Sequence, residues 1–144
     1  MGTERLRIMA LDLGQRRIGL AMSDPLRLSA QGLTTLERRD LGADLAALAS
    51  LAREHRVGEW LLGLPRHMSG SEGEGARAAR RFGAALQRHT ALPVAFWDER
   101  LTTVVAQRVL REAGSSLAKR KRAVDRLAAV ILLQSYLDRA GIVE

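Results

Sequence analysis

The 144-residue sequence contains no cysteine. This absence excludes disulfides, thiolate metal sites and cysteine nucleophiles, so the carboxylates and three histidines remain for metal binding or acid–base chemistry. Aromatic residues make up 3% of the chain, which disfavours a single-strand binder that works by base stacking. The chain also lacks an apolar run of about 18 residues and a basic leader followed by an apolar segment. We therefore expect a cytoplasmic protein without a membrane partner.

Lysine is scarce as well: the chain has two, Lys119 and Lys121. Its formal net charge is nevertheless +7. Arginine supplies the rest of the positive charge. The planar guanidinium fork matches phosphate oxygens, so this composition indicates a nucleic-acid partner. The competing interpretation is that the arginines are scattered, solvated surface charges. Only clusters of cations therefore count as evidence for a nucleic-acid partner. The two clusters considered are Arg16-Arg17 and Lys119-Arg120-Lys121-Arg122.

The length and the 47% of hydrophobic residues predict a single domain over residues 1–144. Apolar runs between turn-forming residues predict strands at residues 6–12, 18–23, 28–36, 60–64 and 93–97. The first three are expected to form an antiparallel meander. With helices between and after the later strands, the order predicts an α/β fold with a mixed five-stranded sheet flanked by helices.

Helical spacing of apolar residues predicts four helices. They are expected to begin after the N-cap Asp40, after the glycine-rich loop 69–75, near Thr102 and near Ala123. We expect the second helix to turn Ala78, Phe82, Ala85 and Leu86 inward. The last helix is apolar nearly all round and is expected to be buried.

Four carboxylates stand in unusual places. Asp12 ends an apolar strand, Asp98 and Glu99 end another, and Asp125 interrupts the apolar surface of the last helix. An ionised carboxylate in such a setting is unfavourable unless it is paired, hydrogen-bonded or bound to a cation. Mg²⁺ or Mn²⁺ would be suitable partners, and two such ions can promote hydrolysis of a phosphodiester. Strand alternation places Asp98 and Glu99 on opposite faces but does not say which one faces the site.

Each acid also has a structural alternative. Asp12 could begin the hairpin turn, Asp98 or Glu99 could pair with Arg100, and Asp125 could pair with Arg122 or cap the last helix. The cations that flank these acids in the sequence are the expected phosphate contacts. They are Arg16, Arg17, Arg100, Lys119, Arg120, Lys121 and Arg122.

Four blocks of the sequence, taken in order, resemble the YqgF/RuvX family. They are Ala10-Leu11-Asp12-Leu13-Gly14 with residues 17–24; Gly63-Leu64-Pro65 with Ser69-Gly70-Ser71; Asp98-Glu99-Arg100-Leu101-Thr102-Thr103; and Lys121 and Asp125 ahead of Ala128-Ala129 and Gln134-Ser135-Tyr136-Leu137. The likeness covers essentially the whole chain.

The resemblance implies a ribonuclease H-like fold related to the RuvC Holliday-junction resolvases. It implies a role as Holliday-junction resolvase, as nuclease for the 5′ end of pre-16S ribosomal RNA, or both. The family's acids map onto Asp12, Glu99 and Asp125 as metal ligands. RuvC-type enzymes carry a glutamate where this chain has Gly63-Leu64-Pro65. Glu99 could replace that acid, and for this reason it is preferred to Asp98.

These observations lead to a first hypothesis of a Mg²⁺- or Mn²⁺-dependent endonuclease acting on branched DNA or a ribosomal RNA precursor. A second hypothesis is a non-catalytic nucleic-acid-binding or ribosome-maturation factor. A third, an ATP-dependent phosphotransferase, would require a second large domain and a phosphate-binding loop that the sequence lacks. A two-fold symmetric junction would favour a homodimer, but no sequence feature distinguishes a homodimer from a monomer.

Overall fold

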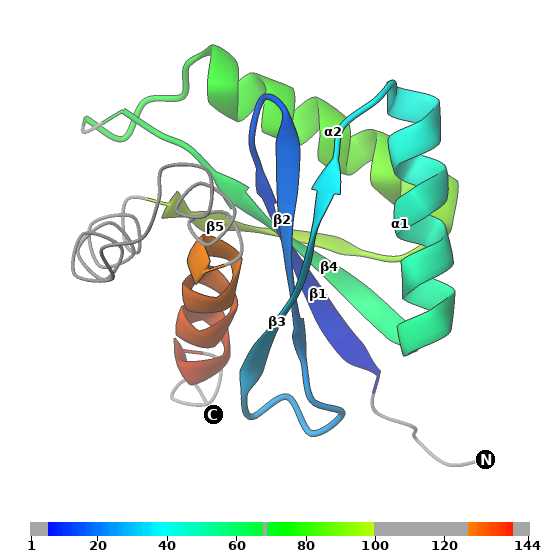
Figure 1. Cartoon of the computed structure of the whole chain (residues 1–144). Coiled ribbons are helices and arrows are strands. Elements are labelled where there is room, and N and C mark those ends of the chain that lie inside the picture. The colour runs from blue at the N-terminus through cyan, green and yellow to red at the C-terminus, as the bar shows by residue number, and fades with distance from the viewer. Residues whose placement is uncertain (1–5, 68, 100–126, 140–144) are drawn as a thin grey trace, which may run out of the picture.

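The computed structural model describes residues 6–67, 69–99 and 127–139. In these ranges the named elements are the following: β1 (Arg7–Leu13), β2 (Arg17–Ser23), β3 (Ala30–Glu37), α1 (Leu41–His55), β4 (Val57–Leu64), α2 (Glu74–Thr90) and β5 (Val94–Asp98). A further helical segment covers residues 127–139. Figure 1 shows α1 and α2 on one face of the twisted sheet and the 127–139 helix on the other.

The sheet has five strands in the order β3-β2-β1-β4-β5. β1, β2 and β3 are antiparallel neighbours, whereas β4 is parallel to β1 and β5 is parallel to β4. The predicted meander and the predicted mixed sheet are therefore confirmed. Because β1, β4 and β5 run in the same direction, their carboxyl ends meet at one edge of the sheet. Residues that end these three strands are brought together there, although they are far apart in the sequence.

Alternation along the strands divides the core into two layers. Met9, Leu11 and Leu62 belong to the layer beneath α1 and α2. Ala10 and Leu61 belong to the layer that packs against the 127–139 helix. This division decides on which face of the sheet each residue at the strand ends lies.

The predicted N-cap of α1 is confirmed. Asp40 accepts a hydrogen bond from the Ala43 backbone nitrogen at 2.8 Å, which satisfies one of the free amides of the first turn. β4 begins at Val57, earlier than the predicted residue 60, because pairing with β1 extends from Arg7 and Val57 onward. The apolar run alone did not reveal these extra residues.

One prediction about a helix face was wrong. Phe82 and Leu86 of α2 are buried as expected, but Ala78 is exposed, and the inner face continues through Ala76 and Ala79 instead. The side of α2 that faces the sheet therefore contains Ala79, three residues before Phe82, and not Ala78, four residues before it. The 127–139 helix packs on the sheet and is buried or half-buried through Leu137, as predicted, while Asp138 and Arg139 at its end are exposed.

The helices predicted near Thr102 and Ala123 begin outside the described residues. Among the helices within the described ranges, none has the length and apolar character needed to cross a membrane.

Candidate active site

Asp12 is the next-to-last residue of β1 and pairs with Gly19 of β2. By alternation its side chain lies on the same face as Ala10, the face covered by the 127–139 helix. Gly14 then closes the hairpin, donating its backbone N–H to the Arg17 carbonyl at 2.8 Å. A Cβ atom at position 14 would lie 2.7 Å from that carbonyl oxygen. The turn that follows Asp12 therefore requires glycine.

Glu99 follows the last residue of β5, and its carboxyl group shares a hydrogen bond with Asp12. Burial is the main cause that raises the pKa of Glu99, to about 8; the negative charge of Asp12, the shared hydrogen bond and the charge of Asp98 raise it further. Two carboxyl groups this close are stable when they share a proton, or when a cation takes its place. The two carboxylates could therefore hold a divalent cation between them.

Gly63 provides the space in which the Glu99 carboxyl group lies. A Cβ atom at position 63 would overlap Glu99 Oε1 and would lie 2.8 Å from both Glu99 Cδ and Leu132 Cδ1. Gly63 stands on β4, the strand between β1 and β5. The carboxyl group of Glu99, a residue beyond β5, thus lies over β4.

Asp98 lies in a different environment from Glu99. Its Oδ2 atom is 3.9 Å from Nη1 of Arg66, and Nη2 of Arg66 is 3.5 Å from Glu72. Glu72 in turn accepts two hydrogen bonds from Arg80 on α2, at 2.7 and 2.6 Å, and the pKa of Glu72 is lowered mainly by this contact. Asp98 therefore belongs to an ion-pair network on the α2 side, and Glu99 to the pair with Asp12.

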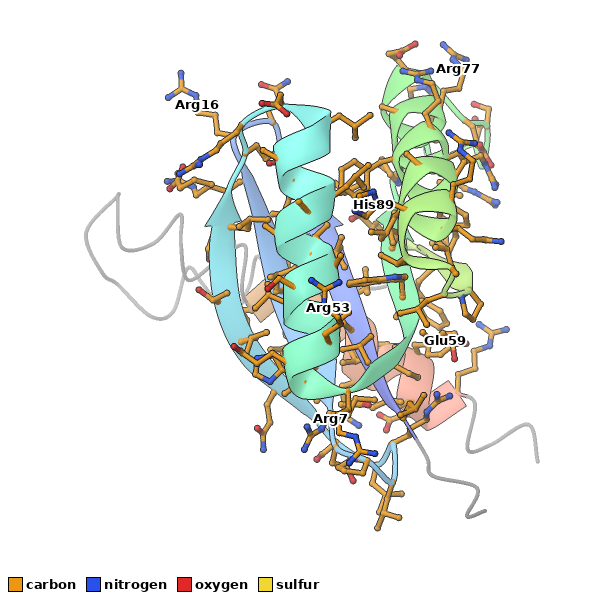
Figure 2. All side chains as sticks on the ribbon, turned by 90° about the vertical axis from the view of Figure 1, so that its right-hand side faces the viewer. Arg7, Arg16, Arg53, Glu59, Arg77 and His89 are labelled. Atoms are coloured by element: carbon orange, nitrogen blue, oxygen red, sulfur yellow. The ribbon has the colours of Figure 1, made fainter. Side chains whose placement is uncertain are left out.

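Arg16 and Arg17 differ in their surroundings. Arg17 lies 3.7 Å from Glu37 across β2 and β3, whereas Arg16 is exposed at the tip of the hairpin. Figure 2 shows Arg16 projecting from the end of the sheet near the start of α1. A groove of about 670 Å³ lies there. It is lined by Gln15, Arg16, Glu37, Arg38, Arg39, Leu41 and Asp44.

Two arginines of this groove were not among the sequence candidates. Arg38 donates to the Gly14 carbonyl at 2.7 Å and lies 3.8 Å from Asp44, so it fixes the hairpin to the start of α1. The side chain of Arg39 is exposed. Their signal in the sequence is a pair of arginines directly before the helix cap Asp40, a place where a side chain projects from a loop.

Several sequence candidates lie outside the described residues. They are Arg100, Lys119, Arg120, Lys121, Arg122 and Asp125. Within the described ranges, no group of three acidic or histidine side chains is arranged to hold a metal ion. Asp12 and Glu99 thus form a two-carboxylate core, to which the described part of the chain adds no third ligand.

The chain is similar to a known protein family over most of its length. The model of the RuvX family, described as Holliday junction resolvase, matches residues 6–139. A candidate pre-16S rRNA nuclease of Moorella thermoacetica is 55% identical over 136 residues, which is 94% of this chain and 97% of the relative. A protein of the same name from Koribacter versatilis is 53% identical over 136 residues, covering 94% of this chain and 89% of its own.

Two solved structures share the fold at low sequence identity. RuvC of Thermus thermophilus, in complex with a Holliday junction substrate, has a TM-score of 0.55 and 14% identity, covering 94% of this chain and 96% of that one. The fowlpox virus resolvase, also in complex with Holliday junction DNA, has a TM-score of 0.56 and 12% identity, covering 94% and 99%.

The mixed sheet with helices on its two faces is the fold that this chain shares with the RuvC-type resolvases, the ribonuclease H-like fold. Within that class the assignment is specific. The chain belongs to the RuvX family.

Proposed function

We propose that this protein is a divalent-metal-dependent endonuclease that hydrolyses a phosphodiester bond in structured nucleic acid. The observation that carries the proposal is the hydrogen-bonded pair of Asp12 and Glu99 at the carboxyl edge of the parallel strands. A substrate bound at this edge would be contacted by the loops that follow the strands. In open α/β sheets, the carboxyl ends of the strands are the usual place for ligands to bind.

The residues present fit a hard divalent cation. Asp12 and Glu99 offer carboxylate oxygens, which Mg²⁺ and Mn²⁺ prefer. The pKa of Glu99 is raised mainly by burial and further by the negative charge of Asp12, and a cation bound between the two groups would offset both effects. We assign both carboxylates as metal ligands and Asp125 as a third. When bound, the metal would activate water and stabilise the charge of the leaving oxygen.

Asp98 has a different role in this proposal. Its contact with Arg66 ties the end of β5 to the segment that leads from β4 to α2. Asp98 therefore acts on catalysis by holding this end of β5, and with it Glu99, in place.

The nucleic-acid strand is proposed to contact the groove at the tip of the hairpin between β1 and β2, which is lined by Arg16, Arg38 and Arg39. Arg16 and Arg39 have exposed side chains at this groove and no ion-pair partner among the described residues, so they are suited to phosphate. Arg17, which lies near Glu37, is assigned a weaker contact. Arg100 and the cations Lys119, Arg120, Lys121 and Arg122 complete the set of proposed phosphate contacts.

Two substrates are proposed from the relatives. The curated relatives carry the name of a pre-16S rRNA nuclease, and RuvC of Thermus thermophilus is described with a Holliday junction. Purified protein would be incubated with a four-way DNA junction and with a 5′-extended 16S RNA precursor, each with Mg²⁺, with Mn²⁺ and with EDTA. We expect metal-dependent cleavage of at least one substrate, and loss of cleavage in Asp12→Asn.

Binding of either substrate without cleavage in any metal would overturn the enzymatic proposal. It would favour the second hypothesis, a nucleic-acid-binding factor in ribosome maturation. In that case Asp12→Asn should bind as tightly as the wild type, because the aspartate would have no catalytic task.

A further inference from the structure

The position next to Asp12 on the neighbouring strand is occupied by glycine. Leu11 pairs with Leu62 in the parallel ladder of β1 and β4, so Asp12 and Gly63 are the next residues along. Both lie on the face that the 127–139 helix covers, because Ala10 and Leu61 belong to the core layer of that face. A side chain at position 63 would therefore point to the same space as the carboxylate of Asp12.

That space is filled by Glu99. The Oε1 atom of Glu99 overlaps the place that a Cβ atom of residue 63 would take, and the δ-methyl carbon of Leu132 lies 2.8 Å from it. Glu99 reaches this place from the neighbouring strand β5, in which Trp97 pairs with Gly63. The carboxylate thus lies over β4 although it belongs to the segment after β5.

The backbone gives no other reason for glycine at position 63. Among the described glycines, Gly70 is the one with a positive φ, and Gly63 lies within the regular pairing of β4 with β5. A glycine inside a strand lowers stability, because it lacks a packing side chain and loses more conformational freedom on folding. The contact that a side chain would disturb here is mainly the carboxyl group of Glu99, rather than backbone.

We propose that Gly63 is a positioning residue: its missing side chain forms the space that holds the Glu99 carboxylate against Asp12. This inference rests on the proposed function, because it concerns the same pair of acids. In this arrangement β4 supplies the space and the residue after β5 supplies the ligand. Position 63, rather than position 99, then determines how close the two carboxylates come.

The first test is Gly63→Ala, with Gly32→Ala as the matched control, because Gly32 is an exposed strand glycine on β3. Mn²⁺ binding would be measured by the electron paramagnetic resonance signal of free Mn²⁺, with cleavage and thermal unfolding in parallel. A displaced ligand reduces metal affinity and rate, so we expect Gly63→Ala to lose at least about tenfold in both. Gly32→Ala should keep both.

The second test moves the carboxylate to β4 and remains informative if Gly63→Ala does not fold. In Gly63→Asp combined with Glu99→Ala, the carboxylate introduced on β4 can enter the space that Glu99 leaves. We expect this double variant to bind Mn²⁺ at least about tenfold more tightly than Glu99→Ala alone, as returning one ligand to the pair would do.

The outcomes separate the two proposals. Equal Mn²⁺ binding in the wild type and Gly63→Ala, or no gain in the double variant over Glu99→Ala, would overturn the positioning role. If the wild type binds Mn²⁺ and Gly63→Ala does not, but the wild type cleaves neither substrate, the positioning role holds and the nuclease proposal fails.

Discussion

Arg66 Nη1 lies 3.9 Å from Oδ2 of Asp98. The pair belongs to the face of the sheet that α2 covers, because Arg66 also approaches Glu72, which is hydrogen-bonded to Arg80 of α2. Glu99, the next residue, shares its hydrogen bond with Asp12 instead. Two adjacent acids thus have different partners, and they should respond differently to substitution.

We therefore predict that Glu99→Gln lowers cleavage by more than about 100-fold, because it removes a charged metal ligand, and that Asp98→Asn lowers it by about tenfold or less. Both rates would be measured at saturating Mn²⁺, and Mn²⁺ affinity would be measured separately. Asp98→Asn should leave that affinity within about threefold of the wild type, as expected for a residue outside the metal shell. The reverse order of the two variants would show that Asp98 is the ligand.

The raised pKa of Glu99 predicts a pH dependence of stability in the metal-free protein. The pKa is about 8 in the folded protein, against 4.5 for an ordinary glutamate, so the folded state binds more protons than the unfolded state between these values. The contribution of Glu99 to the free energy of unfolding therefore falls as pH rises from about 4.5 to about 8, by an amount on the order of 5 kcal/mol.

This prediction would be measured by urea unfolding in EDTA at pH 5, 7 and 9, with Glu99→Gln as the comparison. The variant cannot ionise at this position, so it should become more stable relative to the wild type as pH rises. A difference between the two proteins that stays constant from pH 5 to pH 9 would contradict the shared-proton pair. Mn²⁺ should restore wild-type stability at pH 9, because binding favours the folded, ionised form.

The groove beside the hairpin predicts a salt-dependent loss of binding. Replacing both Arg16 and Arg39 by alanine removes two phosphate contacts, so the slope of log affinity against log salt should become shallower by about two. Affinity would be measured by fluorescence anisotropy in Ca²⁺, at several salt concentrations. Affinity should fall for the DNA junction and the RNA alike, since phosphate contacts carry no base information.

Arg53→Ala is the control for that experiment. Arg53 is an exposed arginine near the carboxyl end of α1, and Figure 2 shows it well separated along the helix from Arg16. Arg53→Ala removes one positive charge, as Arg16→Ala or Arg39→Ala does alone, but from a place outside the groove, so the salt slope should stay at the wild-type value. Equal losses for Arg53→Ala and for either groove arginine would indicate binding through overall charge alone.

The N-cap of α1 predicts a purely structural effect. Asp40→Ala removes the hydrogen bond to the Ala43 backbone nitrogen, and loss of such a cap costs about 1 kcal/mol. Urea unfolding should report this loss, while Mn²⁺ affinity stays unchanged. Asp40→Asn, which can still accept the bond, should recover most of the stability.

Much of the fold was accessible from local sequence patterns. The apolar runs at residues 6–12 and 18–23 with the turn at Gly14 between them predicted the hairpin, and Asp40 before a run of helical periodicity predicted the start of α1. Such signals work because strand and helix periodicity, turns and caps depend on neighbours in the chain. They were less accurate where a neighbouring element decides the outcome. Pairing with β1 makes β4 begin at Val57, and packing on the sheet leaves Ala78 of α2 exposed.

The site depended on contacts that no local pattern contains. The sequence by itself determined which acids end the strands, and the family resemblance favoured Glu99 over Asp98. The tertiary structure decided that Glu99 lies with Asp12 over Gly63 while Asp98 lies with Arg66. The physical reason is the parallel register of β1, β4 and β5, which fixes the residues that are neighbours across the strands and the face of the sheet on which each side chain lies.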